Sequence, residues 1–250
     1  MGREIMLGKT KVIICQDKQE VARKSAAIFA QAIKNNPEIV LGLATGGTPV
    51  GMYKELIEMG KNKEVDFSKV KSFNLDEYAG LDASHPQSYR SFMNQNLFNH
   101  ININKKNTHV PDGEASDCEQ ACRSYEEAIK GAGGIDLQLL GIGSNGHIAF
   151  NEPGSPKQSR TRKVGLTART IDDNTRFFDS RDQVPTQAVT MGIATILEAK
   201  EIVLLATGAN KSVAVAGAIK GPMDSCLPAS FLQRHPACTF VVDKAAACEL

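Results

Sequence analysis

Residues 136–153 read DLQLLGIGSNGHIAFNEP, and this stretch decides the fold class. The apolar run Asp136–Leu140 predicts a buried parallel strand. A glycine-rich turn follows it and presents His147 and, five residues later, Glu152. An α/β enzyme carries acid and base groups in this way, at the carboxyl ends of its strands. The stretch therefore predicts an α/β protein with an acid/base pair after this strand.

The same turn also contains the dinucleotide-binding pattern G-x-G-x-x-G, at Gly141, Gly143 and Gly146. That fingerprint opens a long helix and is followed by an acidic residue about 20 positions later. Here Pro153 and the glycine and proline after it interrupt any such helix, and Leu166 lies near the required spacing. The pattern favours a catalytic turn over a nucleotide site.

Short apolar runs alternate with amphipathic stretches along the rest of the chain. The strands expected are Lys11–Cys15, Ile39–Ala44, Val70–Leu75, Asp136–Leu140, Ile202–Ala206 and Thr239–Val242. The helices expected are Val21–Ile33, Val50–Met59, Ser88–Phe98, Ser116–Lys130, Gln187–Leu197 and Ala209–Ile219. This alternation predicts a parallel sheet with helices on both faces, in a single domain spanning 1–250.

One segment, 155–185, departs from this alternation. It is polar, rich in Arg and Thr, and has little apolar periodicity. A long insertion of this kind is often a mobile lid over an active site. The composition of this segment fits a plain surface loop as well as it fits a lid.

The composition is that of an ordinary globular protein. The chain has 250 residues, of which 42% are hydrophobic and 23% charged, and its net charge is +1. So small a net charge provides no overall attraction to nucleic acid or to a membrane surface. Any anion must therefore be recognised by a local site.

The cysteines and the N-terminus indicate a cytoplasmic protein. The six cysteines read as reduced thiols, and Cys118 and Cys122 lie near no histidine or cysteine that would complete a metal set. Residues 1–11 contain no long apolar segment of the kind found in a signal peptide. No apolar run is long enough to span a bilayer. We expect no metal and no membrane partner.

A glycine loop follows the strand Ile39–Ala44. It consists of Thr45, Gly46, Gly47 and Thr48, with Pro49 after it. Glycines let backbone N–H groups approach a ligand, and a glycine loop at a helix N-terminus is suited to phosphate. Thr48 can cap the following helix, with Pro49 in its first position. An ordinary tight turn between strand and helix is an equal alternative.

Two further strand ends carry charged residues. Asp76 and Glu77 follow Val70–Leu75, and adjacent carboxylates raise one another's pKa, which suits proton abstraction. Taken alone, a solvated turn is the better explanation. Lys211 follows Ile202–Ala206 in the first turn of a helix, where a cation is unfavourable unless it faces an anion. Arg176 could be its partner across a phosphate, although a solvated surface lysine stays open.

Four blocks together resemble the glucosamine-6-phosphate deaminases, a branch of the glucosamine/galactosamine-6-phosphate isomerase family. They read LATGGTP at 43–49, FNLDEY at 73–78, HPQSY at 85–89 and GHIAFNEP at 146–153. Four blocks in this order are highly specific, and the resemblance covers nearly the whole chain. It implies a Rossmann-like, open and mostly parallel sheet with a lid insertion, and no metal or organic cofactor.

The resemblance also implies a reaction and roles for residues. The family converts glucosamine 6-phosphate and water to fructose 6-phosphate and ammonia. By resemblance, His147 opens the sugar ring with help from Glu152 and Asn145, and Asp76 then removes the proton at C2. The residues implied to bind the phosphate of this phosphosugar are Thr45, Gly46, Gly47, Thr48, Arg176 and Lys211. Relatives include monomers and homo-oligomers.

The chain departs from parts of the family pattern. Asn145 stands where some members have Asp, so the ring-opening relay would depend on Glu152. Members regulated by N-acetylglucosamine 6-phosphate have a C-terminal extension and basic residues after the catalytic glutamate. Here Arg162 is present, Val164 occupies the second basic position, and the chain ends at Leu250. The resemblance therefore implies hyperbolic kinetics without activation by this effector.

Two other functions remain open. A 6-phosphogluconolactonase has the same implied fold and a Gly-His turn, but it needs no base for a C2 proton. The Asp76–Glu77 pair and Glu152 favour the deaminase. A non-catalytic sugar-phosphate sensor is the alternative from another class, and an ammonia assay distinguishes it.

Overall fold

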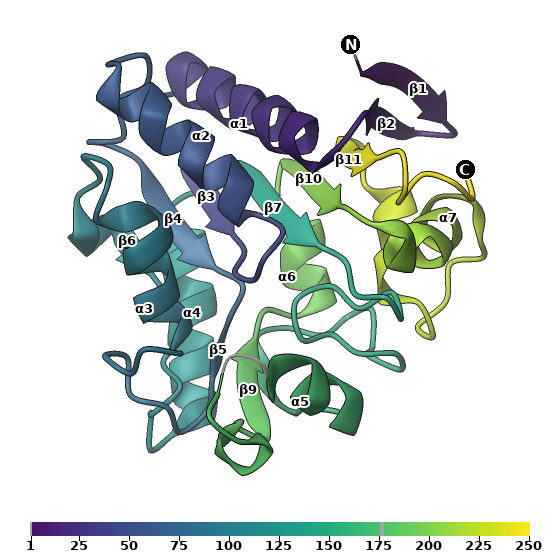
Figure 1. The fold of residues 1–250 in the computed structure, drawn as a ribbon. Helices are drawn as coiled ribbons and strands as arrows, with labels where there is room; N and C mark the ends of the chain where they lie inside the picture. Colours follow the sequence, from purple (N-terminus) through teal and green to yellow (C-terminus); the bar gives the residue numbers. More distant parts are fainter. Residues whose placement is uncertain (1, 176–177) are drawn as a thin grey trace.

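A large, mostly parallel β-sheet forms the centre of the molecule in a computed structural model that describes residues 2–175 and 178–250 (Figure 1). Across the sheet the described strands are β1 (Arg3–Leu7), β2 (Thr10–Cys15), β11 (Cys238–Asp243), β10 (Glu201–Ala206), β7 (Leu137–Gly141), β3 (Val40–Leu43), β4 (Lys71–Asn74) and β6 (Thr108–His109). Only the β1–β2 pair is antiparallel among them. All six strands expected from the sequence are confirmed, to within one or two residues at their ends.

Helices cover both faces of this sheet. Helices α1 (Lys18–Asn35) and α2 (Val50–Lys61) lie side by side on one face, with α4 (Cys118–Gly131) and α6 (Ile193–Leu197) on the opposite face (Figure 1). Right-handed crossovers explain this division, because the chain first steps from β2 towards β4 and then returns from β6 towards β11. The remaining long crossover helix is α7 (Ser212–Lys220), between β10 and β11.

β3 and β7 are parallel, but the direction in which the chain adds successive strands to the sheet reverses between them. These strands are neighbours, and the segments that follow them belong to the two opposite directions of winding. At such a switch point the connecting loops separate and leave a crevice at the carboxyl ends of the strands. The loops after β3 and β7 carry the glycine loop and the histidine turn, so the fold places both beside this crevice.

A second, smaller sheet lies beside the first. It is antiparallel and has the order β5 (Asp76–Tyr78), β9 (Gln187–Thr190), β8 (Arg162–Gly165), with α5 (Ala168–Asn174) following β8. Its own apolar cluster contains Tyr78, Phe150, Leu166 and Ala188. The segment 155–185 therefore contains a strand and a helix, which its composition did not reveal. Its function as a lid remains a prediction.

The helix expected over Gln187–Leu197 is wrong in its first half. Residues 187–190 form the central strand of the small sheet, paired on both sides, and α6 begins only after Gly192. Two neighbouring strands supply backbone hydrogen bonds that a short sequence window does not show. Tertiary pairing therefore overrides the helical spacing of the apolar residues.

The other helix predictions are confirmed with changes in detail. The stretch Ser88–Phe98 is α3 (Tyr89–Met93) followed by a π-helical turn, η1 (Asn94–Phe98), and Ala209–Ile219 begins with the 3₁₀ turn η5 (Ala209–Lys211). Other 3₁₀ segments among the described residues are η2 (Lys105–Asn107), η4 (Arg181–Gln183) and η6 (Pro228–Arg234). Within residues 2–175 and 178–250, no helix has both the length and the apolar character needed to cross a bilayer.

Candidate active site

A cavity of about 230 Å³ lies at the carboxyl ends of β3, β7 and β10. It brings together most of the residues predicted as site residues from the sequence, although they come from four separate segments. Those that line it are Thr45, Gly46, Gly47, Thr48, Asp76, His147 and Lys211. The strand-end positions expected from the sequence therefore converge on one cavity.

The glycine loop forms one wall of this cavity. Gly46 has a φ of 92°, a conformation that favours glycine because it lacks a Cβ atom. Helix α2 starts directly after the loop at Val50. Thr48 does not cap this helix: Pro49 is the cap residue and no side-chain hydrogen bond is made there. The first-turn N–H groups of α2 are thus left without a side-chain cap, which suits the binding of an anion.

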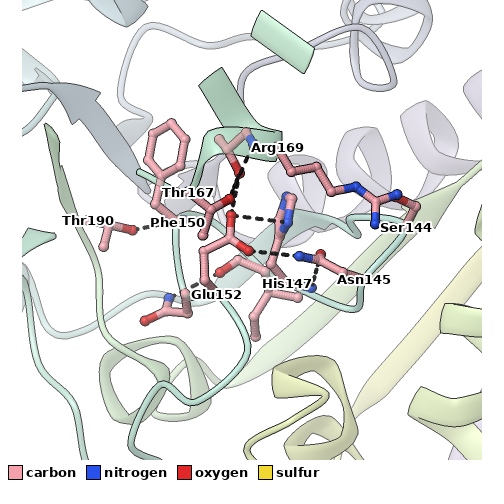
Figure 2. Close-up of polar contacts among 11 residues, drawn as sticks. Ser144, Asn145, His147, Phe150, Glu152, Thr167, Arg169 and Thr190 are labelled. Carbon is pink, nitrogen blue, oxygen red and sulfur yellow. Dashed lines mark hydrogen bonds and ion pairs between the residues drawn. The ribbon is translucent and has the colours of Figure 1, made fainter. Parts of the chain in front are cut away.

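The turn after β7 orders a group of three polar side chains (Figure 2). The Asn145 amide donates to Glu152 Oε2 at 2.8 Å, and its Oδ1 accepts from the backbone N–H of His147 at 3.2 Å. The His147 Nδ1 atom lies 3.6 Å from Glu152 Oε1, an ion-pair distance that is longer than a hydrogen bond. Asn145 therefore ties the carboxylate and the histidine backbone into one unit.

Two glycines make this turn possible. A Cβ atom on Gly143 would lie 2.3 Å from His147 Nδ1, so only glycine allows the imidazole to pack against the backbone there. Gly146 has a φ of 83° and is likewise restricted to glycine. No long helix follows these glycines in the described structure, since residues 144–150 form turns. The G-x-G-x-x-G pattern thus shapes a tight turn that presents His147 at the cavity.

Asp76 is a buried carboxyl group on the cavity wall. Its exposed fraction is 6%, and burial, together with the charge of Glu77, raises its pKa to about 8. Glu77 is stabilised differently, because it accepts backbone N–H groups from Tyr78, Tyr89 and Arg90 at 2.8–3.0 Å. Burial still raises the pKa of Glu77 above its ordinary value. The pair thus contains one anchored carboxyl group and one that faces the cavity.

Lys211 also lines the cavity. It ends η5, and its N–H donates to the carbonyl of Gly208 at 3.1 Å. Gly208 has a φ of 91°, and its own N–H donates to both carboxylate oxygens of Asp243. This buried aspartate fixes the turn that carries the lysine. Arg176, the other cation predicted to bind phosphate, lies outside the described residues.

Several functional candidates were not predicted from the sequence. Thr170 on α5 donates its hydroxyl to Glu152 Oε1, and Tyr89 and Asn174 line the cavity. Thr190 accepts from the backbone N–H of Phe150 at 3.1 Å. These residues lie in the small sheet or beside it, and of them only Tyr89 belongs to one of the four blocks of the resemblance, HPQSY at 85–89. Knowing that β9 pairs with β5 would have been needed to find them.

Arg162 is half-buried and is held by hydrogen bonds. Its guanidinium donates to Asn151 Oδ1 at 2.9 Å, and Asn151 in turn donates to the carbonyls of Ile148 and Met191. Val164 packs against the apolar cluster of the small sheet. Insensitivity to N-acetylglucosamine 6-phosphate remains a prediction.

A larger groove of about 840 Å³ follows α4 on another part of the surface. Its central charges already satisfy one another: Glu126 accepts from Thr161 and Thr195, and Arg160 pairs with Glu126 and Glu198. Among the described residues no cluster of three or more His, Cys, Asp or Glu could hold a metal ion. The cavity at the strand ends is therefore the better candidate for an active site than the groove along α4.

Comparison with known proteins identifies the family of this chain. The model of the glucosamine-6-phosphate isomerase/6-phosphogluconolactonase family matches residues 16–241. A glucosamine-6-phosphate deaminase of Thermoanaerobacter pseudethanolicus is 55% identical over 237 residues, covering 95% of this chain and 94% of its own. One of Cellvibrio japonicus is 55% identical over 240 residues, covering 96% and 91%. The chain belongs to this family, and the prediction of an enzyme of carbohydrate metabolism is confirmed.

Solved structures confirm the Rossmann-like fold. A monomeric glucosamine-6-phosphate deaminase superposes with a TM-score of 0.93 at 44% identity, over 96% of this chain and 99% of that one. A 6-phosphogluconolactonase from Trypanosoma cruzi superposes with a TM-score of 0.77 at 22% identity, over 98% of each chain. At that identity the likeness to the lactonase shows the fold alone.

Proposed function

We propose that this enzyme converts glucosamine 6-phosphate and water to fructose 6-phosphate and ammonia. The observation that carries the proposal is the pairing, on one cavity, of a histidine–glutamate unit with a separate buried carboxyl group, Asp76. An aldose–ketose conversion needs two such centres, since ring opening and proton transfer between carbons occur at different atoms. The 55% identical relatives bearing this activity support the assignment.

Ring opening is the task of the first centre. The C1 hydroxyl loses its proton, the C1–O5 bond breaks, and O5 gains a proton. His147 is suited to transfer this proton, because imidazole exchanges protons readily near neutral pH. Glu152 lies 3.6 Å from its Nδ1 and stabilises the imidazolium, while Asn145 fixes the carboxylate through Oε2. The product of this step is the open-chain aldehyde.

Proton transfer between C2 and C1 is the task of Asp76. Its carboxylate takes the proton from C2 while the C1 carbonyl oxygen gains a proton from the substrate's ammonium group, and the resulting enolamine then receives the C2 proton at C1. The imine formed at C2 is then hydrolysed by water, releasing ammonia and the ketose. Burial and Glu77, which raise the pKa of Asp76 to about 8, make its carboxylate a stronger base than an exposed one. The substrate's ammonium group beside C2 favours the ionised form.

The phosphate is bound at the other end of the cavity. Backbone N–H groups of the Thr45–Thr48 loop and of the start of α2 form an anion site, and Lys211 supplies a charge. Arg176 is proposed as a second cation. Binding the phosphate away from the reacting carbons positions C1 near His147 and C2 near Asp76. The steps are proton transfers and a hydrolysis, and they require no electron acceptor.

The deciding experiment is an ammonia assay with purified enzyme and glucosamine 6-phosphate. We expect ammonia and fructose 6-phosphate in equal amounts. Parallel assays use 6-phosphogluconolactone and unphosphorylated glucosamine. Lactone hydrolysis without ammonia release would reject the deaminase in favour of the lactonase. Binding of the phosphosugar without turnover would indicate a sensor.

A further inference from the structure

A threonine of the small-sheet region contacts the proposed ring-opening unit. Thr170 lies on α5, is 6% exposed, and lines the active-site cavity. Its hydroxyl donates to Glu152 Oε1, the same oxygen that faces His147 Nδ1. The two oxygens of this carboxylate are therefore fixed from different directions, Oε2 by Asn145 from the turn and Oε1 by Thr170 from the helix.

The direction of this hydrogen bond follows from a count of donors. Thr167, the N-cap of α5, accepts from the backbone N–H of Thr170 at 3.2 Å. The two threonine hydroxyl oxygens lie 3.0 Å apart. Each hydroxyl has one proton, and an ionised carboxylate can only accept. The consistent arrangement has Thr167 donating to Thr170, and Thr170 donating to Glu152.

A second side chain supports the docking of α5 on this turn. Arg169 donates to the hydroxyl of Ser144 at 2.7 Å (Figure 2). Consecutive residues of one helix thus contact both ends of the loop that carries His147. Thr170 can reach Glu152 only while α5 lies in this position.

We propose that Thr170 is a positioning residue for ring opening, which fixes Glu152 Oε1 beside His147 and makes this step depend on the placement of α5. No proton passes through Thr170 in this role. The inference rests on the proposed function, because it assigns His147 and Glu152 to ring opening. Without the threonine hydroxyl, the carboxylate turns about its bond to Cγ, and the imidazolium loses a fixed counter-charge.

The test compares Thr170→Val with Thr170→Ser. Valine keeps the shape of threonine and removes the hydroxyl, whereas serine keeps the hydroxyl. Thr195→Val is the matched control, since Thr195 also donates its hydroxyl to a glutamate, Glu126, at 2.6 Å but lies outside the cavity. The readouts are kcat and KM with glucosamine 6-phosphate, the thermal midpoint, and the affinity for 2-amino-2-deoxyglucitol 6-phosphate, an open-chain analogue with no ring to open.

We expect kcat of Thr170→Val to fall by roughly 10- to 100-fold, as misplacement of a catalytic group predicts. Thr170→Ser and the control should retain kcat, and all variants should bind the open-chain analogue equally well. Full activity of Thr170→Val, or an equal loss in Thr170→Ser, would overturn the positioning role. A loss that appears equally in analogue binding would overturn it as well, by pointing to general damage of the site. A wild-type enzyme that releases no ammonia would instead overturn the proposed function itself, and this inference with it.

Discussion

The large sheet and the small sheet supply the active site in different ways. The large sheet contributes loops at the ends of its parallel strands, namely the glycine loop, the His147 turn and the Lys211 turn. The small sheet contributes Asp76 from within a strand, together with α5, which carries Thr170. Loops present backbone N–H groups and charged tips to a ligand, whereas a strand buries its side chain in a low-dielectric setting.

This difference separates the two chemical tasks. Glu152, in a loop of the large sheet, is oriented by hydrogen bonds from Asn145 and Thr170. Asp76 receives its basicity from burial and from the neighbouring Glu77. Hydrogen bonding fixes geometry, and desolvation raises a carboxyl pKa. In the proposed mechanism, the parallel sheet would therefore position the substrate, and the small sheet would set the pKa of the base.

Of the substitutions proposed, Asp76→Asn should have the largest effect. The amide keeps the shape of the side chain but cannot accept the C2 proton, so we expect kcat to fall by about 10³–10⁴-fold, the upper end for loss of a general base. Binding of the phosphosugar should remain within a few-fold. Exchange of the C2 proton with deuterated solvent measures the step directly. Undiminished exchange in the variant would eliminate Asp76 as the base.

The proposed ring-opening unit in the turn after β7 is tested by His147→Gln and Glu152→Gln. We expect each to slow turnover by roughly 10²-fold, and the double variant to be little slower than the worse single one. Groups that act as a unit lose most of their effect when the first is removed. Steady-state rates of the three variants suffice. A double variant showing the full product of both losses would mean that the two residues act independently.

Phosphate recognition by the large sheet is tested by Lys211→Ala. Loss of a charge-assisted hydrogen bond costs about 1.5–3 kcal/mol, so KM for the phosphosugar should rise by roughly 10- to 100-fold. Residual turnover of unphosphorylated glucosamine should be unchanged. Lys220→Ala, an exposed lysine at the far end of the same helical segment, is the control. Equal losses with both substrates would show that Lys211 stabilises the fold instead.

The two regions also differ in how far the sequence predicts them. The alternation of apolar runs and amphipathic stretches was enough for the six parallel strands, because each buried strand is a continuous local signal. The small sheet was missed: Asp76–Tyr78 extends a strand already predicted, and Gln187–Thr190 has the spacing of a helix. Its β5–β9 pair joins residues more than 100 positions apart, which no sequence window contains.

In the site, too, residues with a local sequence motif were predicted, and residues that depend on tertiary packing were not. Asp76, Asn145, His147 and Glu152 were identified through their motifs, and the structure brings them to one region. Thr170 was not identified, because its function depends on where α5 docks and not on its neighbours in sequence. The cap predicted for Thr48 is wrong, since the turn leaves Pro49 as the cap residue and the threonine faces the cavity.

The smallest expected effect concerns stability, because burial of Asp76 in the small sheet makes the free energy of unfolding depend on pH. The pKa of Asp76 is raised from 3.8 to about 8 on folding. The folded state therefore binds this proton more tightly than the unfolded state, and the contribution to stability is lost as the pH rises from about 4 through about 8. Asp76→Asn has no proton to lose, so its stability should not show this fall.

The variant and the wild type should thus be about equally stable near pH 4, while above pH 8 the variant should be more stable by about 1–3 kcal/mol, the usual cost of a buried polar group without a partner. Urea unfolding at pH 5 and pH 9 measures the difference, provided that both proteins unfold in one step. The control is Asp117→Asn, because Asp117 is exposed and asparagine caps α4 equally well. A stability difference for Asp76→Asn that does not change with pH would show that the carboxyl group is already ionised when buried. The basicity of Asp76 would then have to come from the bound substrate rather than from the small sheet.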